Sequence, residues 1–234
     1  HCNEGHAAFI GVERIRNLIA KKHLSFSEAM EVIRSSSLFT THTPVPAGHD
    51  AFPESMIRQY MSHYPDVLGI TWDQFINLGK TNPNDPNEKF SMSVLACNLS
   101  QEVNGVSWLH GEVSKDILGN MWPGYFKNEL HIGYVTNGVH FPTWVASNLR
   151  RLYAKYFGDA FSGHTYNIPE WQNVHKIDDK ELWAERMFLK ERLIKTIRKR
   201  YSDPTQVRLQ SPRQMVQVTE SIKPDVLTIG FARR

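Results

Sequence analysis

The chain has 234 residues, with 27 basic and 24 acidic side chains and a formal net charge of +3. These charges are spread along the whole length, and the densest basic run, 190–200, falls in an expected helix, so composition does not indicate nucleic-acid binding. Two cysteines, Cys2 and Cys97, are too few for a disulfide framework and predict reduced, buried thiols in a cytoplasmic protein. No apolar run approaches the ~20 residues of a membrane helix, and no charged-then-apolar leader is present, so we expect a soluble protein.

The length fits one large domain or two modest ones, since domains commonly run to ~100–200 residues. The chain starts without methionine and ends directly after an apolar run. We therefore expect it to be an internal piece of a longer protein.

The first expected helix follows a short polar segment. Its apolar positions are spaced by four, three and four residues, which predicts one buried face made of Ala8, Val12, Ile15 and Ile19. Asn3 is a candidate N-cap, and Glu4 would then lie in the first turn, where the helix dipole favours an anion. The glycine before His6 weakens the helix start but lets a ligand or a backbone come close.

A second expected helix, 27–35, leads into a short apolar strand, 38–41, which stops at His42. Two prolines follow, and each restricts its own φ angle and that of the residue before it, so the loop should be stiff. Ligands of open α/β folds gather at the carboxyl ends of strands. His42 is therefore a candidate substrate-binding residue, although a histidine here can also serve only to hydrogen-bond a turn.

The middle of the chain is expected to be mainly helical. Helical patterns cover 54–63, 72–78, 90–101 and 108–117, a polar loop covers 80–89, and no element is assigned to 103–107. The helix at 90–101 should bury Met92, Leu95, Ala96 and Leu99. His110 lies inside a helical pattern and is interpreted as a core or helix-packing residue.

A second strand is expected at 132–135, and it also ends in a polar loop that contains Asn137. An Asn-Gly pair after a strand is typical of a turn, because both residues tolerate positive φ. The loop nevertheless parallels the one at His42, so the two loops are expected to face one cleft.

The last third is expected to be helical before a final strand. Predicted helices cover 143–156, with Trp144, Leu149 and Leu152 as core candidates, 178–201, with a capping box at Asp178 and Glu181, and 211–222. The long helix should carry Trp183, Met187, Ile194, Ile197 and Tyr201 on one stripe.

The segment 158–175 is irregular and aromatic. Residues 224–229 are predicted to form the first strand of a new parallel sheet, with Arg233 and Arg234 at its end, where guanidinium groups are suited to hold a phosphate.

Six segments of the chain, taken together and in order, resemble the α-glucan (glycogen/maltodextrin) phosphorylases in their shorter bacterial and archaeal form. These segments are 3–9 (NEGHAAF), 41–50 (THTPVPAGHD), 103–107 (VNGVS), 109–114 (LHGEVS), 135–140 (VTNGVH) and 228–234 (TIGFARR). Six segments in register over nearly the whole chain are far more specific than any one motif.

The resemblance implies a helix-rich α/β fragment of a two-lobed GT-B glycosyltransferase with Rossmann-like lobes. It implies that residues 1–140 form the C-terminal part of the first lobe and that 141–234 begin the second lobe, ending in its first strand. The full-length enzyme would be a cytoplasmic glycogen phosphorylase that uses orthophosphate to cleave α-1,4-glucan to glucose 1-phosphate with retention. Its cofactor would be pyridoxal phosphate, whose phosphate exchanges a proton with the substrate phosphate. A homo-oligomer is left open.

The resemblance also assigns site residues. His42 would contact the 6-hydroxyl of the terminal glucose through its side chain, while its carbonyl faces the anomeric carbon, where a carbonyl dipole favours a developing positive charge. Asn137 would bind the same hydroxyl. Glu4 and His6 would line the pocket beside the glucose, and Arg234 would hold the substrate phosphate.

Three departures from the family pattern matter. The lysine that pairs with the phosphate-binding arginine and the lysine that binds pyridoxal phosphate are both absent from this chain, so we expect the fragment alone to be inactive. Animal-type members carry an aspartate at the position of Glu4, which makes their phosphorylation control doubtful here.

Two alternatives come from other classes. A glycogen synthase type of transferase, which uses a sugar nucleotide, shares the two-lobed fold. A non-catalytic glucan-binding module would use the six tryptophans as sugar platforms, although most of them fall at positions suited to core packing. Zinc binding is disfavoured, because His42 and His49 lack a helical i, i+4 relation or a Cys-x-x-Cys partner.

Overall fold

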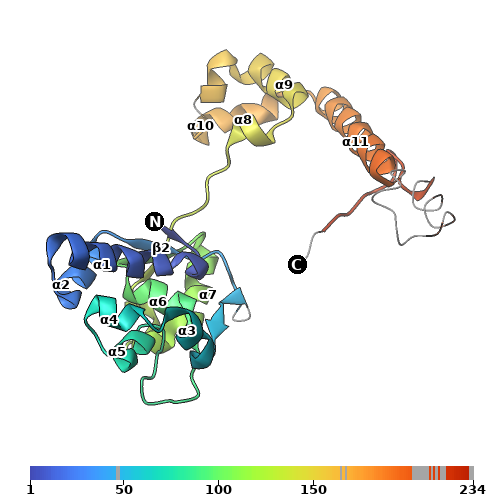
Figure 1. Cartoon of the computed structure of the whole chain (residues 1–234). Coiled ribbons are helices and arrows are strands. Elements are labelled where there is room, and N and C mark those ends of the chain that lie inside the picture. Colours follow the sequence, from blue (N-terminus) through green and yellow to red (C-terminus); the bar gives the residue numbers. More distant parts are fainter. Residues whose placement is uncertain are drawn as a thin grey trace. The chain divides into compact units, whose positions relative to one another are not determined.

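The computed structural model describes residues 1–45, 48–163, 165–166, 168–201, 211, 213, 216 and 220–231 (Figure 1). The chain divides into two compact units, His1–Gly138 and Val139–Arg234. Within the described residues, each helix is either too short or too polar to cross a membrane.

The first unit is built on a four-stranded parallel sheet. Its strands are β1 (Cys2–Asn3), β2 (Leu38–Thr40), β5 (Glu102–Gly105) and β6 (Ile132–Tyr134), in the spatial order β1-β2-β5-β6. One register row crosses the whole sheet and is buried throughout: Cys2, Phe39, Val103 and Ile132. Side chains in one such row point to the same face, so this row forms the sheet's contribution to the core. The predicted strands at 38–41 and 132–135 are confirmed, whereas β1 and β5 were not predicted.

Helices pack around this sheet (Figure 1). They are α1 (Phe9–Lys22), α2 (Phe26–Ser35), α3 (Glu54–Met61), α4 (Tyr64–Leu68), α5 (Trp72–Asn77), α6 (Met92–Asn98) and α7 (Trp108–Leu118), with 3-10 turns η1 (Gly5–Ala7), η3 (Gly119–Met121) and η4 (Lys127–Glu129). A small antiparallel pair joins β3 (Ala51–Phe52) to β4 (Phe90–Ser91). The predicted helices in this half are confirmed in position, except that the one at 90–101 begins at Met92, after β4.

The buried faces of these helices follow the predicted spacing. In α6, Met92, Leu95 and Ala96 are buried, and Leu99 is buried directly after the helix ends. The face of α1 buries Val12 and Ile15. These side chains and the register row of the sheet belong to one continuous hydrophobic core.

The start of the first helix differs from the prediction. Asn3 is not an N-cap, because its backbone pairs with Thr40 in the sheet, and α1 begins only at Phe9. Glu4 therefore does not lie in the first turn of a helix. The expected close approach at Gly5 is confirmed, since a Cβ atom there would lie 2.9 Å from the Ser93 backbone nitrogen.

Both cysteines of the first unit are buried and free, as predicted. Burial raises the pKa of the Cys2 thiol and also that of the Cys97 thiol. The thiolate is the reactive form of cysteine, so these side chains act as small core residues.

The second unit is helical in the part that the structure describes. Its elements are α8 (Phe141–Trp144), α9 (Ser147–Phe157), η5 (Asp159–Gly163), α10 (Ile168–Trp171), η6 (Gln172–Lys176) and α11 (Asp179–Tyr201). The predicted continuous helix 143–156 is wrong, because Val145 and Ala146 adopt extended ψ angles of 126° and 144° and separate α8 from α9. Trp144, a predicted core residue, is consequently 75% exposed, whereas Leu152 is buried as expected.

An aromatic cluster forms the interior of this unit. Its members are Phe141, Tyr153, Phe157, Phe161 and Trp171. The rings of Phe157 and Phe161 meet edge to face at 4.6 Å between centroids, which is a favourable aromatic geometry. The aromatic segment that the sequence indicated as irregular thus consists of short helical turns packed on α9.

Helix α11 begins as predicted, but its capping box is only half formed. The Asp178 carboxylate accepts hydrogen bonds from the backbone N–H groups of Lys180 and Glu181. The Glu181 side chain does not cap the helix, because it accepts hydrogen bonds from Lys155 and Tyr156 on α9 instead.

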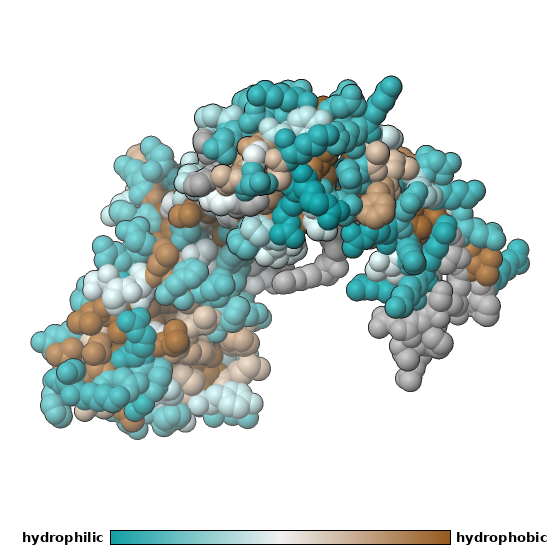
Figure 2. Space-filling model, turned by 90° about the horizontal axis from the view of Figure 1, so that it is seen from above, coloured by the Kyte–Doolittle hydropathy of each residue, from teal (hydrophilic) through white to brown (hydrophobic). Residues whose placement is uncertain are grey.

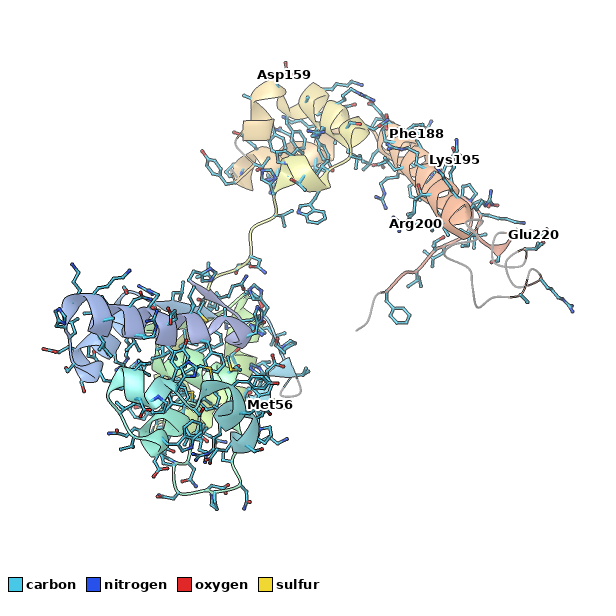
Figure 3. All side chains as sticks on the ribbon, in the orientation of Figure 1. Met56, Asp159, Phe188, Lys195, Arg200 and Glu220 are labelled. Atoms are coloured by element: carbon cyan, nitrogen blue, oxygen red, sulfur yellow. The ribbon has the colours of Figure 1, made fainter. Side chains whose placement is uncertain are left out.

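The apolar stripe predicted on α11 is only partly buried. Ile194 is buried, whereas Trp183 is 67% exposed. Phe188, Lys195 and Arg200 mark the length of this helix in Figure 3. In both units hydrophobic residues reach the surface between hydrophilic ones (Figure 2).

The predicted final strand is not formed in the described residues 220–231. Pro224 and Asp225 make a turn, and residues 227–231 have no regular secondary structure. A strand needs a hydrogen-bonded neighbour, and the described part of this unit offers none, so Leu227 and Ile229 are each 83% exposed. The predicted helix at 211–222 falls largely outside the described residues.

Candidate functional site

Two of the predicted site residues lie at the same edge of the first unit's sheet. His42 follows the carboxyl end of β2, and Asn137 follows the carboxyl end of β6. The strands are parallel and only β5 separates them, so their carboxyl ends open at one edge. With neighbouring strands ~4.8 Å apart, the β2 and β6 axes are separated by about 10 Å. The two loops thus lie at one edge of the sheet, and the expectation that they face one cleft stays a prediction.

Glu4 organises the loop that carries His42. Its carboxylate accepts a 2.6 Å hydrogen bond from the His42 backbone N–H and a 3.0 Å bond from the Thr43 hydroxyl. The Thr41 hydroxyl lies 3.5 Å from the second carboxylate oxygen. Hydrogen bonds to a carboxylate are stronger than those between neutral groups. The Glu4 carboxylate thus contacts three consecutive residues of the His42 loop, Thr41, His42 and Thr43.

The backbone of Glu4 is strained. Its φ and ψ angles are 69° and 159°, in a region that is essentially restricted to glycine. Its own N–H donates to the Thr40 carbonyl at 2.9 Å, so the turn follows directly from the end of the β1–β2 pairing. A non-glycine residue in this conformation costs about 1–3 kcal/mol and persists where its surroundings hold it. The Glu4 side chain supplies those contacts.

The orientation of the His42 carbonyl follows from its neighbours. The Thr43 N–H, which belongs to the same peptide plane, donates to the Thr41 hydroxyl at 3.3 Å. In a trans peptide the C=O and N–H groups point in opposite directions, so the His42 carbonyl points away from Thr41. Because Thr41 is fully buried and His42 is exposed, this carbonyl is directed away from the core.

Two further residues, Asn3 and His49, hold the same loop. The Asn3 side-chain oxygen lies 2.6 Å from Nε2 of His42. His49 donates from Nε2 to the Thr43 carbonyl at 3.3 Å, and its Nδ1 accepts from the Ser93 hydroxyl at 2.7 Å. Sequence reasoning missed all of these contacts, because Asn3 was interpreted as a helix cap and Ser93 gave no signal at all.

Asn104 connects the loops across the sheet. Its side-chain oxygen accepts from the Thr40 hydroxyl at 2.9 Å, and its backbone carbonyl accepts from the Thr41 N–H at 3.1 Å. Its side-chain nitrogen donates to the Gly105 carbonyl, which also accepts from the Val135 N–H at 2.9 Å. A buried residue therefore ties the end of β2 to the end of β6. The sequence placed Asn104 in the segment 103–107 that resembles the family but gave it no role.

The loop after β5 also holds the backbone of Asn137. The Asn137 N–H donates to the Val106 carbonyl at 3.1 Å, and the Val106 N–H donates to Nδ1 of His110 at 3.2 Å. His110 is buried, which confirms its interpretation as a packing residue of α7. Its Nε2 has no hydrogen-bond partner among the described residues.

The remaining predicted site residues stand apart from this network. His6 is exposed in η1, and no hydrogen bond ties it to the described residues. Arg234 and its neighbour Arg233 lie outside the described residues. The described part of the chain holds no group of three His, Cys, Asp or Glu side chains that could bind a metal ion.

Comparison with known proteins agrees with the resemblance seen in the sequence. The profile of the carbohydrate phosphorylase family matches residues 1–219. The chain is 40% identical to a glycogen phosphorylase of Aquifex aeolicus and 39% identical to one of Mycobacterium tuberculosis. It is 34% identical to a maltodextrin phosphorylase of Thermococcus litoralis.

Each of these three matches covers the whole chain but only part of the relative. The chain corresponds to 33% of the Aquifex protein and to 27% of each of the other two. The family match spans nearly all of the sequence, and the sheet edge described above carries several of the motifs that first suggested it. This chain, a helix-rich α/β structure with a parallel sheet, belongs to the carbohydrate phosphorylase family.

Proposed function

We propose that this chain is part of an α-glucan phosphorylase that cleaves glycogen or maltodextrin with orthophosphate. In this proposal the whole protein has the two-lobed GT-B fold. Residues 1–140 form the C-terminal part of its first lobe, and residues 141–234 begin the second lobe. The family match and the names of the relatives support the reaction class, and the boundary at Gly138 agrees with the division between lobes.

The proposed reaction transfers a glucosyl unit to phosphate with retained configuration. A phosphate oxygen forms a bond to C1 of the terminal glucose, the bond from C1 to the neighbouring sugar oxygen breaks, and that oxygen takes up the proton that the incoming hydrogen phosphate gives up. Positive charge develops at C1 as the bond breaks. A carbonyl dipole held in advance near C1 stabilises that charge without reorganisation.

His42 supplies two groups to this site. Its carbonyl, directed away from the core by the Thr41 contact, faces the anomeric carbon, and its imidazole binds the 6-hydroxyl of the glucose. Asn137, across β5 at the same edge, binds the same hydroxyl. Glu4 acts by fixing the His42 loop, because its carboxylate oxygens already accept bonds from that loop. His6 completes the wall of the pocket, and Arg234 holds the phosphate.

Pyridoxal phosphate is the cofactor that the family resemblance implies for the whole enzyme, in which it supplies a phosphate close to the substrate phosphate. The edge described here does not fit that group. Its loops, 3–6, 41–45, 104–107 and 135–138, contain neither the lysine needed for a covalent link nor an arginine to hold the phosphate. We assign no step of the reaction to the cofactor at this edge.

The observation that carries the proposal is the placement of His42 and Asn137 at one sheet edge, linked through Glu4 and Asn104. The test uses the full-length protein with glycogen and orthophosphate and no added nucleotide. Release of glucose 1-phosphate is expected. Glucose transfer that requires a sugar nucleotide would instead identify the synthase type of enzyme.

Substitution of His42 tests whether this residue belongs to the site. His42→Ala is expected to lower turnover by about tenfold or more, because it removes the imidazole hydrogen bond to the 6-hydroxyl and keeps the backbone carbonyl, while the circular dichroism spectrum stays unchanged. His23→Asn is the matched control, because His23 is an exposed histidine whose left-handed backbone suits asparagine. Equal turnover of His42→Ala and the unaltered enzyme would remove His42 from the site.

The glucan-binding module is not favoured by the comparisons. One of its premises is nevertheless stronger than the sequence suggested, because Trp108, Trp144 and Trp183 are each more than 60% exposed. The other three, Trp72, Trp122 and Trp171, are half-buried, so the expectation that most tryptophans pack in the core is not met. Glycogen retention that depends on these three side chains and not on His42 would support such a module.

A further inference from the structure

The contact between Asn3 and His42 determines more than the position of a loop. The Asn3 side-chain oxygen lies 2.6 Å from Nε2 of His42. An amide oxygen can only accept a hydrogen bond, so the imidazole nitrogen facing it has to carry the hydrogen. A neutral imidazole has one N–H group, and the other nitrogen then presents a lone pair. Asn3 therefore leaves Nδ1 of His42 as an acceptor.

The surroundings of His42 leave that acceptor available. Among the residues that the structure describes, none donates a hydrogen bond to Nδ1, and the side chain is exposed. The His42 backbone is already held by Glu4, next to Asn3 in the chain, so the ring has few remaining degrees of freedom. One hydrogen bond at Nε2 is then enough to fix its orientation. Two consecutive residues, Asn3 and Glu4, thus control the ring and the backbone of the same histidine.

We propose that Asn3 is a positioning residue that holds His42 in the Nε2–H tautomer, so that Nδ1 accepts a hydrogen bond from the 6-hydroxyl of the terminal glucose. This inference rests on the proposed function for the identity of the sugar. It makes the hydroxyl a donor to His42, which leaves the oxygen of that hydroxyl to accept from the Asn137 amide. The site therefore selects a group that can donate, and it discriminates against a fluorine or a hydrogen at C6.

The first test measures this selection in the full-length enzyme with its cofactor bound. Phosphate release from glucose 1-phosphate and a maltodextrin primer is compared with release from the 6-deoxy and 6-deoxy-6-fluoro analogues. Assays are run at about pH 8.5, above the ~6.5 at which histidine ordinarily titrates. The unaltered enzyme is expected to prefer glucose 1-phosphate by about tenfold or more in kcat/KM, the scale of one lost hydrogen bond.

Three variants separate positioning from folding. Asn3→Ala removes the acceptor and is expected to reduce the preference over the fluoro analogue to about threefold or less. Asn3→Asp keeps an oxygen at the same position and is expected to retain the preference. Asn128→Ala, a change at an exposed asparagine of η4, is the matched control and should leave all three rates unchanged. Equal losses for all three substrates in Asn3→Ala would assign Asn3 a merely structural role and overturn the inference.

The second test reads the tautomer directly and needs no activity. Nitrogen-proton correlation spectra of the histidine-labelled protein show which ring nitrogen carries the hydrogen, and His42→Gln identifies the signals of His42 by their loss. Hydrogen on Nε2 is expected in the unaltered protein and in Asn3→Asp, and a mixture of tautomers is expected in Asn3→Ala. Hydrogen on Nδ1 in the unaltered protein would overturn the inference.

The two tests also separate this inference from the proposed function. An enzyme that releases no phosphate from glucose 1-phosphate would refute the proposed function, while the spectra would still decide the tautomer. An active enzyme whose His42 tautomer and C6 preference are both insensitive to Asn3→Ala would refute the role of Asn3 alone.

Discussion

The two units of this chain are stabilised in different ways. The first unit has a parallel sheet whose buried register row runs through Cys2, Phe39, Val103 and Ile132 into one continuous core. The described part of the second unit has helices around an aromatic cluster, and its last described segment exposes apolar side chains such as Leu227. A parallel sheet brings loops from distant parts of the sequence to one edge.

This difference explains where a site can be described. At the sheet edge of the first unit, hydrogen bonds connect segments that are 37–39 residues apart in the sequence, as between Glu4 and the His42 loop. In the described part of the second unit, Glu181 is linked to Lys155 and Tyr156, 25–26 residues away, and Lys190 donates to the Val226 carbonyl, 36 residues away. Neither link involves a predicted site residue. The following predictions test this contrast, in order of decreasing expected effect.

The largest effect is expected in the sheet. Phe39→Ala should destabilise the first unit by about 3–5 kcal/mol, because the side chain is fully buried in the central register row and its removal leaves a cavity. Hydrogen exchange measured peptide by peptide would follow each unit separately. Exchange should accelerate throughout β2 and β5 and stay unchanged in α9. Val32→Ala, at an exposed position of α2, should change the free energy of unfolding by less than about 0.5 kcal/mol.

A smaller loss is expected from the aromatic cluster of the second unit. Phe161→Ala should cost about 3 kcal/mol, the lower end for such a change, since the partly exposed neighbouring rings can move into the space. Trp144→Ala is the informative comparison, because sequence reasoning placed Trp144 in the core and the structure exposes it. Its loss should change stability by less than about 0.5 kcal/mol in chemical denaturation. A loss of stability near that of Phe161→Ala would instead support the predicted continuous helix 143–156, with Trp144 in the core.

Substitutions of Glu4 can separate the effect of its backbone strain on stability from the effect of its side chain on turnover. Glu4→Gly should change the free energy of unfolding by less than about 1 kcal/mol, because relief of about 1–3 kcal/mol of backbone strain offsets the lost hydrogen bonds to Thr41, His42 and Thr43. Turnover of the full-length enzyme should nevertheless fall by about tenfold or more, since the His42 loop loses its anchor.

The control for Glu4 is Glu4→Gln, which keeps an oxygen acceptor in place. Glu4→Gln should lose less turnover than Glu4→Gly. It should also be less stable than Glu4→Gly, because it keeps the strained backbone. If Glu4→Gly kept full turnover, the carboxylate would have no role in positioning His42.

Sequence reasoning reached the elements with strong local patterns. The apolar spacing at Val12 and Ile15 predicted the buried face of α1, and the strands that end at His42 and near Asn137 were placed within a residue or two. Strand β1 was missed because it has only two residues, and β5 was missed because its sequence, EVNG, contains a single apolar side chain and so gives no local pattern. The pairing that makes both of them strands is with residues far away in the sequence. Local pattern therefore indicated the loops of the site but not the sheet that brings them together.

The contacts inside the site were less accessible from the sequence. Asn3 had two chemically sensible roles, a helix cap and a hydrogen-bond partner in a sheet, and only pairing with Thr40 decides between them. Trp144 and Trp183 sit at helical spacing from true core residues, but a break in one helix and an exposed face of another leave them outside. Local sequence patterns do not show which distant strands pair or where a helix ends, and these two properties decided the positions of Asn3 and Trp144.

The smallest effects are expected on the stability of the two units at acidic pH, where one ion pair in each unit loses its carboxylate charge. The Arg16 hydrogen bond, strengthened by the charge of that guanidinium, lowers the pKa of Glu13 to about 2, and this pair lies within a single helix. The Lys155 hydrogen bond lowers the pKa of Glu181, which joins α9 to α11. A carboxylate whose folded-state pKa lies below its unfolded value of ~4.3 stabilises the fold above that pH. Each contribution is lost as the pH falls through the folded-state pKa.

The two pairs should respond differently although the sign is the same. Loss of the Glu13 charge should loosen one turn of α1 and weaken the hydrogen bond from the Tyr64 hydroxyl of α4, whereas loss of the Glu181 charge should weaken the packing of α11 on α9. Thermal melting of the second unit, followed by the near-ultraviolet signal of its aromatic cluster, should therefore move to lower temperature as the pH falls below the ordinary glutamate pKa of ~4.3, and Glu181→Gln should remove that dependence. Both pairs are exposed, so added salt should reduce each effect. An acid-induced shift of the second unit that persists in Glu181→Gln would mean that other groups link α9 to α11.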